Sequence, residues 1–508
     1  MPNPDWHQHA KTIDLSIHNL IDGQRYLSVP AKDIVDIEKY SPHNGQLLYS
    51  FSCGKPQDVN QAAIAARTAF TQGHWSKLPV AKRAEVLYRL IDLVEQHRET
   101  LALYECLDVG KPISNALNDI SGVVSRLRTA ATLATQLHTN AAVDCGHLSY
   151  QRYKPRGVVA CIGAWNFPLM IIAGQMAPAL MMGNSIIIKP SEFTSLATQH
   201  LVDLAHKAGI PAGVINIVHG EGNIVGDALA RHPDIDMVAF VGSSATGRQI
   251  MTTAGQSNMK QVLMECGGKS PFIVFDDCPD DLEVLAQRIV GAAFGNQGEN
   301  CMAGSRLLLQ KGMGEKLLPL VVEKAAAIKA GDPLNPDTRF GALINEAHLN
   351  KVLAYIDSGR KQGANLLTGG ERVVLSRDDA LGNSLEKGFY LEPTIFDQVS
   401  PDSTIAQEEI FGPVLSVTHF TDEAEAIALA NNSSYGLAAY AATTNLSRAQ
   451  RLGEQLNCGG LFIYASNTST GSAAVLGATK HQQSGNGFKG GEEGMREYAI
   501  PTTMHFFT

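Results

Sequence analysis

A cysteine in a glycine-rich stretch is the residue of this sequence best suited to do chemistry. Cys301 lies in GNQGENCMAG (residues 295–304), where glycines and small side chains would let backbone and ligand come close to the thiol. A thiol in such a turn is a candidate nucleophile. Free cysteine is also among the most buried residue types, so for Cys301 taken alone a structural thiol is the favoured interpretation.

Two residues far from Cys301 in the chain favour catalysis. Glu265 lies in the apolar, glycine-rich run MECGGK, where a raised pKa would suit its carboxylate for general-base work; the alternative is a salt bridge to Lys269. Asn166 lies in WNFP, and its amide could stabilise the oxyanion formed when a thiol attacks a carbonyl. By itself, an asparagine before an aromatic–proline pair is more typical of a turn.

Two motifs have residue types that could bind a dinucleotide. In FVGSSATG, Gly242 and Ser243 come between a predicted strand and a helix, where free N–H groups attract phosphate. The spacing is not GxGxxG, so an ordinary turn is equally favoured. In KPSE, Lys189 and Glu192 end another predicted strand. The carboxylate could bind ribose hydroxyls and repel a 2′-phosphate, although a simple helix cap is the better interpretation of this motif alone.

Alternating apolar runs and helical periodicity predict an α/β fold. Apolar runs of strand length alternate with helices, as in a parallel, Rossmann-type sheet, and a second alternating series follows. The first series has strands at 157–164, 184–190, 214–218 and 237–241 with helices at 58–105 and 195–208. The second has strands at 272–275, 306–309 and 414–417 with helices near 281–294, 314–329 and 423–431. Residues 361–391 are predicted to be a loop, and 500–507 an exposed terminal strand that could pair with another subunit.

The net charge, the cysteine pattern and the distribution of apolar residues argue against several classes of protein. The net charge of −9 argues against a nucleic-acid partner. Eight scattered cysteines form neither a zinc-binding pattern nor a disulfide framework, which predicts no metal site and a reducing, cytoplasmic compartment. No signal peptide is visible, and glycines and prolines interrupt the most apolar stretch (158–188), so no membrane span is expected.

In this order and at these spacings, WNFP, KPSE, FVGSSATG, ECGGK, GNQGENC and EEIFGP resemble the motifs of the NAD(P)-dependent aldehyde dehydrogenase superfamily. The likeness runs from about residue 15 to near the C-terminus, and residues 256–280 most resemble the branch acting on γ-glutamylaminobutyraldehyde and other ω-amino aldehydes. It implies the family fold, which has three parts: a Rossmann-type NAD-binding domain (1–132 and 156–265), an α/β catalytic domain (266–465) and a small β oligomerisation element (133–155 and 480–508).

The resemblance also implies roles for the motif residues. Cys301 would attack the aldehyde, Asn166 would hold the oxyanion, and Glu265 would activate the water that hydrolyses the thioester. The resemblance further implies a homodimer or homotetramer and NAD in preference to NADP. The implied cofactor-binding residues are Trp165, Lys189, Glu192, Gly242, Ser243, Glu409 and Phe411, and the implied substrate-binding residues are Phe167, Gly174, Asn300, Asn467 and Ser469.

The chain departs from the family pattern near the predicted substrate entrance. Most relatives have Pro-Phe-Gly-Gly where residues 474–478 read AVLGA, and Arg-Glu where this chain has Phe488-Lys489. The carboxylate sometimes placed in a proton relay is therefore missing. Many relatives have a tryptophan where Gly174 stands, and its loss would widen the tunnel and weaken an aromatic cage for quaternary ammonium groups. Glu299, beside the nucleophile, either contacts substrate or faces solvent.

Three functions fit these observations. The leading one is hydrolytic oxidation of a polar, functionalised or bulky aldehyde, such as an ω-amino, acylated-amino or semialdehyde substrate. A CoA-acylating semialdehyde dehydrogenase is the second, and Glu265 counts against it because such relatives usually lack that base. A catalytically silent protein on the same fold is the third, and intact Cys301, Glu265 and Asn166 count against it.

Overall fold

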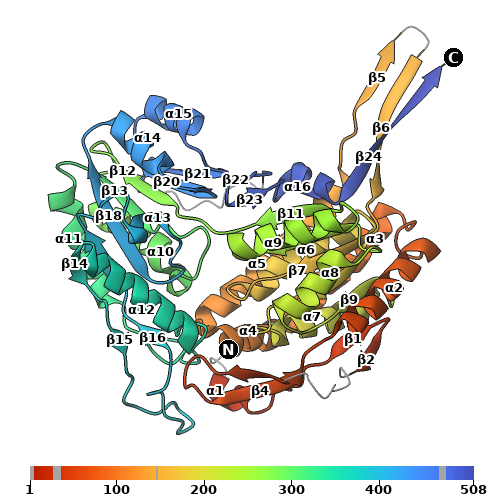
Figure 1. Cartoon of the computed structure of the whole chain (residues 1–508), viewed down its shortest axis with the longest axis horizontal. Helices are drawn as coiled ribbons and strands as arrows, with labels where there is room; N and C mark the ends of the chain where they lie inside the picture. The colour runs from red at the N-terminus through yellow and green to blue at the C-terminus, as the bar shows by residue number, and fades with distance from the viewer. Residues whose placement is uncertain (1–4, 27–35, 145–146, 468–475, 508) are drawn as a thin grey trace.

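Two large, mainly parallel sheets form the body of the protein, and a three-stranded arm projects from it (Figure 1). The computed structural model describes residues 5–26, 36–144, 147–467 and 476–507. Within these ranges, no helix has both the length and the apolar character needed to cross a bilayer.

The first sheet has a buried parallel centre flanked by short antiparallel strands, and the four strands predicted for the Rossmann-type half are confirmed within it. Because the central strands are parallel, their carboxyl ends share one edge, where α/β proteins bind ligands. The spatial order is β2 (Gln24–Tyr26), β1 (Asn19–Ile21), β9 (Ile215–Ile217), β8 (Ser185–Lys189), β7 (Val158–Ile162), β10 (Met237–Val241), β11 (Gln261–Glu265) and β23 (Gly485–Asn486).

The second sheet contains the three strands predicted for the second series, which are also confirmed. The predicted loop at 361–391 is wrong in part, because three short strands lie in it: β14, β15 (Arg372–Val373) and β16 (Tyr390–Leu391). The spatial order of the sheet is β14 (Asn365–Thr368), β17 (Thr394–Asp397), β18 (Val414–Phe420), β13 (Arg306–Gln310), β12 (Pro271–Val274), β20 (Ala438–Ala442) and β21 (Gly460–Tyr464).

The predicted helices are confirmed, with 58–105 divided into three. Alanine, leucine and valine at helical spacing form their buried faces. The helices that the argument below uses, or that the sequence predicted, are α2 (Pro56–Gln72), α3 (Val80–Gln96), α4 (Arg98–Val109), α5 (Ile113–Thr135), α6 (Pro168–Met181), α7 (Leu196–Lys207), α9 (Ser244–Gln256), α10 (Leu282–Phe294), α11 (Gly314–Ala327), α12 (Glu346–Lys361), α14 (Glu423–Asn431) and α16 (Gly491–Glu497).

Helices α5 and α6 pack against each other beside the first sheet. Pro168 begins α6, a position where the fixed φ of proline suits the helix and its missing N–H costs nothing. Nearly every residue of α6 is buried, so the helix is apolar on all sides. Gly174 is one of its two residues that are not fully buried.

The arm consists of β5 (Ala141–Asp144), β6 (His147–Pro155) and β24 (Ala499–Phe507). The terminal strand predicted at 500–507 is confirmed, and it pairs antiparallel with β6 of its own chain, from Ala499 opposite Pro155 to Phe507 opposite His147. The other edge of β24 has no partner strand within the described ranges. Pairing of that edge with another subunit stays a prediction, as do the boundaries of the three domains.

Candidate active site

The carboxyl edge of the first sheet gathers residues from four of the predicted motifs. Trp165 and Asn166 follow β7, Lys189 is the last residue of β8, and Glu265 is the last residue of β11. Register places Lys189 beside Ile162 and Glu265 beside Val241 on neighbouring strands. The fold therefore brings these motifs together although they are widely separated in the sequence.

Buried hydrogen bonds fix the orientation of Asn166. Its side-chain Nδ2 donates to the Glu299 carbonyl at 3.0 Å. Its own carbonyl accepts from Lys111 Nζ at 2.9 Å and from Asn296 Nδ2 at 3.2 Å. A primary amide has two N–H donors, so one N–H of Asn166 stays available for a ligand.

A tight turn presents Cys301. Asn296 and Gln297 have φ values of 53° and 58°, and Gly298 has 72°. A Cβ on Gly298 would lie 2.3 Å from the Gly412 carbonyl oxygen, so only glycine permits this approach of the GNQGENC and EEIFGP motifs.

Glu299, in the same turn, is fully buried and accepts a hydrogen bond from the Ile344 N–H at 3.0 Å. Its burial raises the pKa of this carboxyl well above the ordinary value. The alternative in which Glu299 faces solvent is wrong.

The Cys301 thiol is half-buried at the end of this turn. Burial and the negative charge of Glu265 raise the pKa of Cys301 to about 12. The thiol is therefore protonated at neutral pH, and the attacking thiolate forms only if a base removes the proton.

Glu265 forms an ion pair with Lys489 of the C-terminal segment. Burial raises the pKa of Glu265, but the positive charges of Lys489 and Lys480 outweigh that effect, and the pKa lies below its ordinary value. The expectation of a raised pKa is wrong because the fold places two lysines of the C-terminal segment, more than 200 residues away in the sequence, beside this carboxylate.

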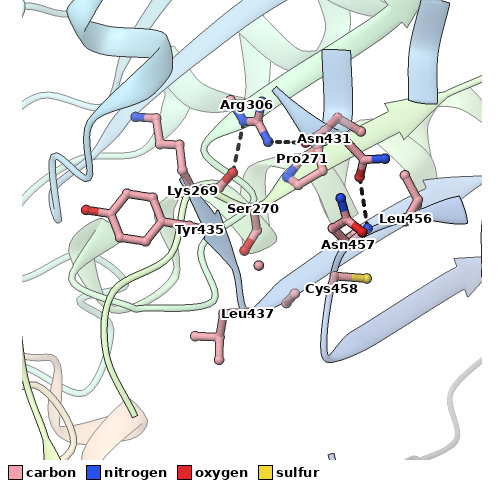
Figure 2. A pocket seen from close by; sticks show the side chains of 14 residues that line it. Lys269, Ser270, Pro271, Arg306, Asn431, Tyr435, Leu437, Leu456, Asn457 and Cys458 are labelled. Atoms are coloured by element: carbon pink, nitrogen blue, oxygen red, sulfur yellow. Dashed lines mark hydrogen bonds between the residues drawn. The ribbon is translucent and has the colours of Figure 1, made fainter. Parts of the chain in front are cut away.

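The alternative salt bridge from Glu265 to Lys269 is also wrong. The Lys269 side chain is buried, and its Nζ has no hydrogen-bond partner within the described ranges. Figure 2 shows its surroundings, where Arg306 Nε donates to the Lys269 carbonyl at 2.9 Å. The cavity there has a volume of about 10 Å³ and holds a water molecule at most.

A much larger cavity, of about 530 Å³, lies beside Glu265. Gly174 lines it, together with side chains from α5, α6, β21 and the C-terminal segment. Its size suits a small-molecule ligand. Of the two cavities, this one has the size and the position for a substrate.

The other predicted substrate residues have different surroundings. The Phe167 ring packs on Lys111 Nζ at 4.3 Å, and Asn300 Oδ1 accepts from the Met302 N–H at 3.0 Å. The Asn467 carbonyl accepts from Arg288 Nη2 at 2.9 Å. None of these three lines the large cavity. Ser469 lies outside the described residues.

The predicted cofactor residues surround the same edge of the sheet. Lys189 Nζ lies 3.2 Å from Glu192 Oε2. Ser243 caps the N-terminus of α9 by accepting from the Thr246 N–H at 3.2 Å. This helix end, beside Gly242, is open to solvent and offers the free N–H groups that bind phosphate.

Glu409 and Phe411 reach this edge from the second sheet. Glu409 Oε1 accepts from the Gly268 N–H at 3.0 Å, and burial raises the pKa of the Glu409 carboxyl. The Phe411 ring packs edge-on against Trp165, with 5.2 Å between ring centroids. The residue types and positions fit a dinucleotide.

Comparison with known proteins agrees with this geometry. The model of the aldehyde dehydrogenase family matches residues 29–504. The chain belongs to the aldehyde dehydrogenase family. This aldehyde dehydrogenase is 42% identical to the NADP/NAD-dependent aldehyde dehydrogenase PuuC of Escherichia coli (strain K12) over 482 residues, 94% of this chain and 93% of PuuC.

Solved structures of this family share its fold. The P. syringae indole-3-acetaldehyde dehydrogenase AldA, in complex with NAD+ and IAA, has a TM-score of 0.93 at 40% identity over 99% of both chains. The γ-glutamyl-γ-aminobutyraldehyde dehydrogenase of Burkholderia cenocepacia has a TM-score of 0.92 at 38% identity, again over 99% of both. The resemblance of this aldehyde dehydrogenase to that branch, and its family fold, are confirmed.

Sequence reasoning missed three cations of the site: Arg126, Lys480 and Lys489. Position 489 was noted only for the carboxylate that it lacks. Positive charges at 480 and 489, four residues before and two residues after the SGNG motif, were the available signal, but only the fold shows which carboxylate they face.

Proposed function

We propose that this aldehyde dehydrogenase oxidises a polar, functionalised or bulky aldehyde to the carboxylic acid, with NAD as acceptor and Cys301 as nucleophile. The observation that carries the proposal is the convergence of Asn166, Glu265 and Cys301. Asn166 is hydrogen-bonded to the Glu299 carbonyl two residues before Cys301, and the charge of Glu265 acts on the Cys301 thiol.

The first half of the reaction forms a covalent bond to Cys301. Glu265, held ionised by Lys489, accepts the thiol proton, and the sulfur adds to the aldehyde carbon. The free N–H of Asn166 donates to the resulting oxyanion. NAD, when bound, supplies the acceptor for the hydride that leaves the aldehyde carbon. The substrate is then a thioester on Cys301.

The second half releases the acid. Glu265 first releases the thiol proton to solvent and is ionised again. It then accepts a proton from water, whose oxygen attacks the thioester carbon, and the carbon–sulfur bond breaks. The departing sulfur takes this proton from Glu265 and becomes the Cys301 thiol again. Glu265 suits this role because it is ionised, lines the large cavity and stands near the thiol.

The chain's own residues could hold NAD. We assign Gly242 and Ser243, at the N-terminus of α9, to the pyrophosphate, and Lys189 and Glu192 to the adenosine ribose. Glu409 would hold the nicotinamide ribose, with Trp165 and Phe411 packed beside the ring. The Glu192 carboxylate would repel a 2′-phosphate, so we expect NAD in preference to NADP.

The test is NADH formation from a panel of aldehydes, each with and without CoA. We expect turnover without CoA, abolished in Cys301→Ala with NAD binding retained. Turnover that requires CoA would favour the acylating alternative. Persistent turnover in Cys301→Ala would refute the assignment of the nucleophile, and no turnover on any aldehyde would favour the silent protein.

We also propose that the arm joins subunits into a homodimer or homotetramer. Val143 and Phe507 are 81% and 77% exposed there, which is unusual for large apolar side chains. Sedimentation equilibrium of the full chain tests this, and a monomer at all concentrations would refute it.

A further inference from the structure

The large cavity combines apolar walls with an excess of positive charge. Its apolar lining includes Ile171, Met302 and Phe462. Its charged lining consists of three cations, Arg126, Lys480 and Lys489, and one carboxylate, Glu265. Charges that line a cavity act more strongly on a ligand than charges on an open surface, because protein replaces part of the surrounding water.

The two lysines have partners within the protein. Lys489 forms the ion pair with Glu265. Lys480 Nζ donates to the carbonyls of Asn486 and Gly487, both at 3.3 Å. Lys489 therefore neutralises the carboxylate of the described lining. Burial lowers the pKa of Lys480 to about 8, so Lys480 carries most of its positive charge at pH 7 and loses part of it near pH 8.

Arg126 differs from these lysines. It projects from α5 and has no hydrogen bond or ion pair to any residue in the ranges that the structure describes, and its Nε is buried without a partner. A buried guanidinium nitrogen without an acceptor is unfavourable, and a carboxylate is the group whose geometry matches it best.

The absence of a side chain at Gly174 leaves space for the Arg126 side chain. A Cβ built on Gly174 would lie 3.7 Å from Arg126 Cδ and 3.8 Å from Arg126 Nη1. The guanidinium therefore runs along the face of α6 where a larger side chain at position 174 would stand. The widened cavity is partly filled by a cation from α5.

We infer that the cavity takes aldehydes with an apolar body and a carboxylate, and that Arg126 binds this carboxylate. The inference rests on the proposed function, because it concerns the substrate of the same site. Arg126 supplies N–H donors in a planar fork, which a carboxylate can accept in pairs. The remaining positive charge disfavours ω-amino aldehydes among the substrates predicted above.

Four aldehydes of matched length test the inference: 6-oxohexanoate, its methyl ester, hexanal and 6-(trimethylammonio)hexanal. We expect 6-oxohexanoate to have the highest kcat/KM. Arg126→Met should lower that value by about 10- to 100-fold and change the value for hexanal by less than about threefold, because hexanal offers nothing to the guanidinium. Arg126→Lys should restore part of the loss.

Arg128→Met is the matched control, because Arg128 is exposed on the same helix and does not line the cavity. It should leave all four values unchanged. Equal losses on 6-oxohexanoate and hexanal in Arg126→Met, or preference of the wild type for the trimethylammonium aldehyde or for the methyl ester, would overturn the inference.

Binding of hexanoate and of hexyltrimethylammonium, measured by calorimetry, separates the inference from the proposed function because neither compound reacts. Tighter binding of hexanoate that Arg126→Met weakens at least about fivefold supports the carboxylate site even if no aldehyde is oxidised. If the enzyme oxidises hexanal but Arg126→Met changes neither the kcat/KM for 6-oxohexanoate nor the binding of hexanoate, the proposed function stands and the carboxylate site is refuted.

Discussion

Lys489, from the C-terminal segment, forms an ion pair with Glu265 at the end of β11. The Glu265 side chain is 9% exposed and the Lys489 side chain 39% exposed, so the lysine reaches inward from the surface to the carboxylate. The tail thus controls the charge state of the residue that we assign as general base.

Replacing Lys489 should change how the reaction depends on pH. In Lys489→Met, burial would dominate, the pKa of Glu265 would rise, and the base would be protonated over a wider range at low pH. We expect deacylation to fall at least about threefold at pH 5 and to change less than about twofold at pH 8. The release of acid after a burst of 4-nitrophenyl acetate hydrolysis measures this step without NAD.

Lys82→Met is the control, because Lys82 is exposed and its ion pair, with Glu85, lies on the surface. If the deacylation rate of Lys489→Met falls at low pH along the same curve as that of the wild type, the ion pair does not set the pKa of Glu265.

The raised pKa of Cys301 predicts slow alkylation in the resting enzyme. Below a pKa of about 12, the rate of reaction with iodoacetamide should increase about tenfold for each pH unit. Mass spectrometry of the peptide that contains Cys301 measures the rate of alkylation. A rate independent of pH between 7 and 9 would mean that the resting residue is already a thiolate.

Glu192 should decide between the two nicotinamide cofactors. Glu192→Ser removes the carboxylate that would repel a 2′-phosphate, while Lys189 remains to attract it. We expect the KM for NADP to fall about tenfold and the KM for NAD to rise several-fold. Glu85→Ser, an exposed acidic residue of α3, is the control. Unchanged KM values for both cofactors in Glu192→Ser would show that Glu192 does not contact the adenosine ribose.

A methyl group at Gly267 should disturb the cofactor site without unfolding the protein. The added Cβ would lie 2.2 Å from Glu409 Oε2, so the carboxylate would have to leave the Gly268 N–H. We expect Gly267→Ala to raise the KM for NAD at least about tenfold.

The matched control is Gly255→Ala on α9, where the added Cβ meets nothing within 4 Å. It should preserve the KM and raise the free energy of unfolding by about 0.4–1 kcal/mol. A normal KM for NAD in Gly267→Ala would exclude Glu409 from cofactor binding.

The sequence predicts the two sheets well because their central strands are continuous apolar runs ended by glycine or proline, as Ser185–Lys189 is ended by Pro190. It fails at 365–391 because the short strands there lie in a polar stretch rich in glycine and asparagine and lack the continuous apolar run of the buried strands. It also predicts the pKa of Glu265 in the wrong direction. That pKa depends on Lys489, and no local pattern indicates which distant charge will face a carboxylate.

The close packing of Arg126 against Gly174 couples the side chains that positions 126 and 174 can accept. A tryptophan at 174 would take the space of the guanidinium, and a small neutral residue at 126 would leave a hole beside the glycine. Alanine at 174 would make only ordinary contact with Arg126, so that substitution alone should be tolerated. A bulky residue at 174 should be accommodated only if Arg126 is also replaced, so a change of substrate at this site requires paired substitutions.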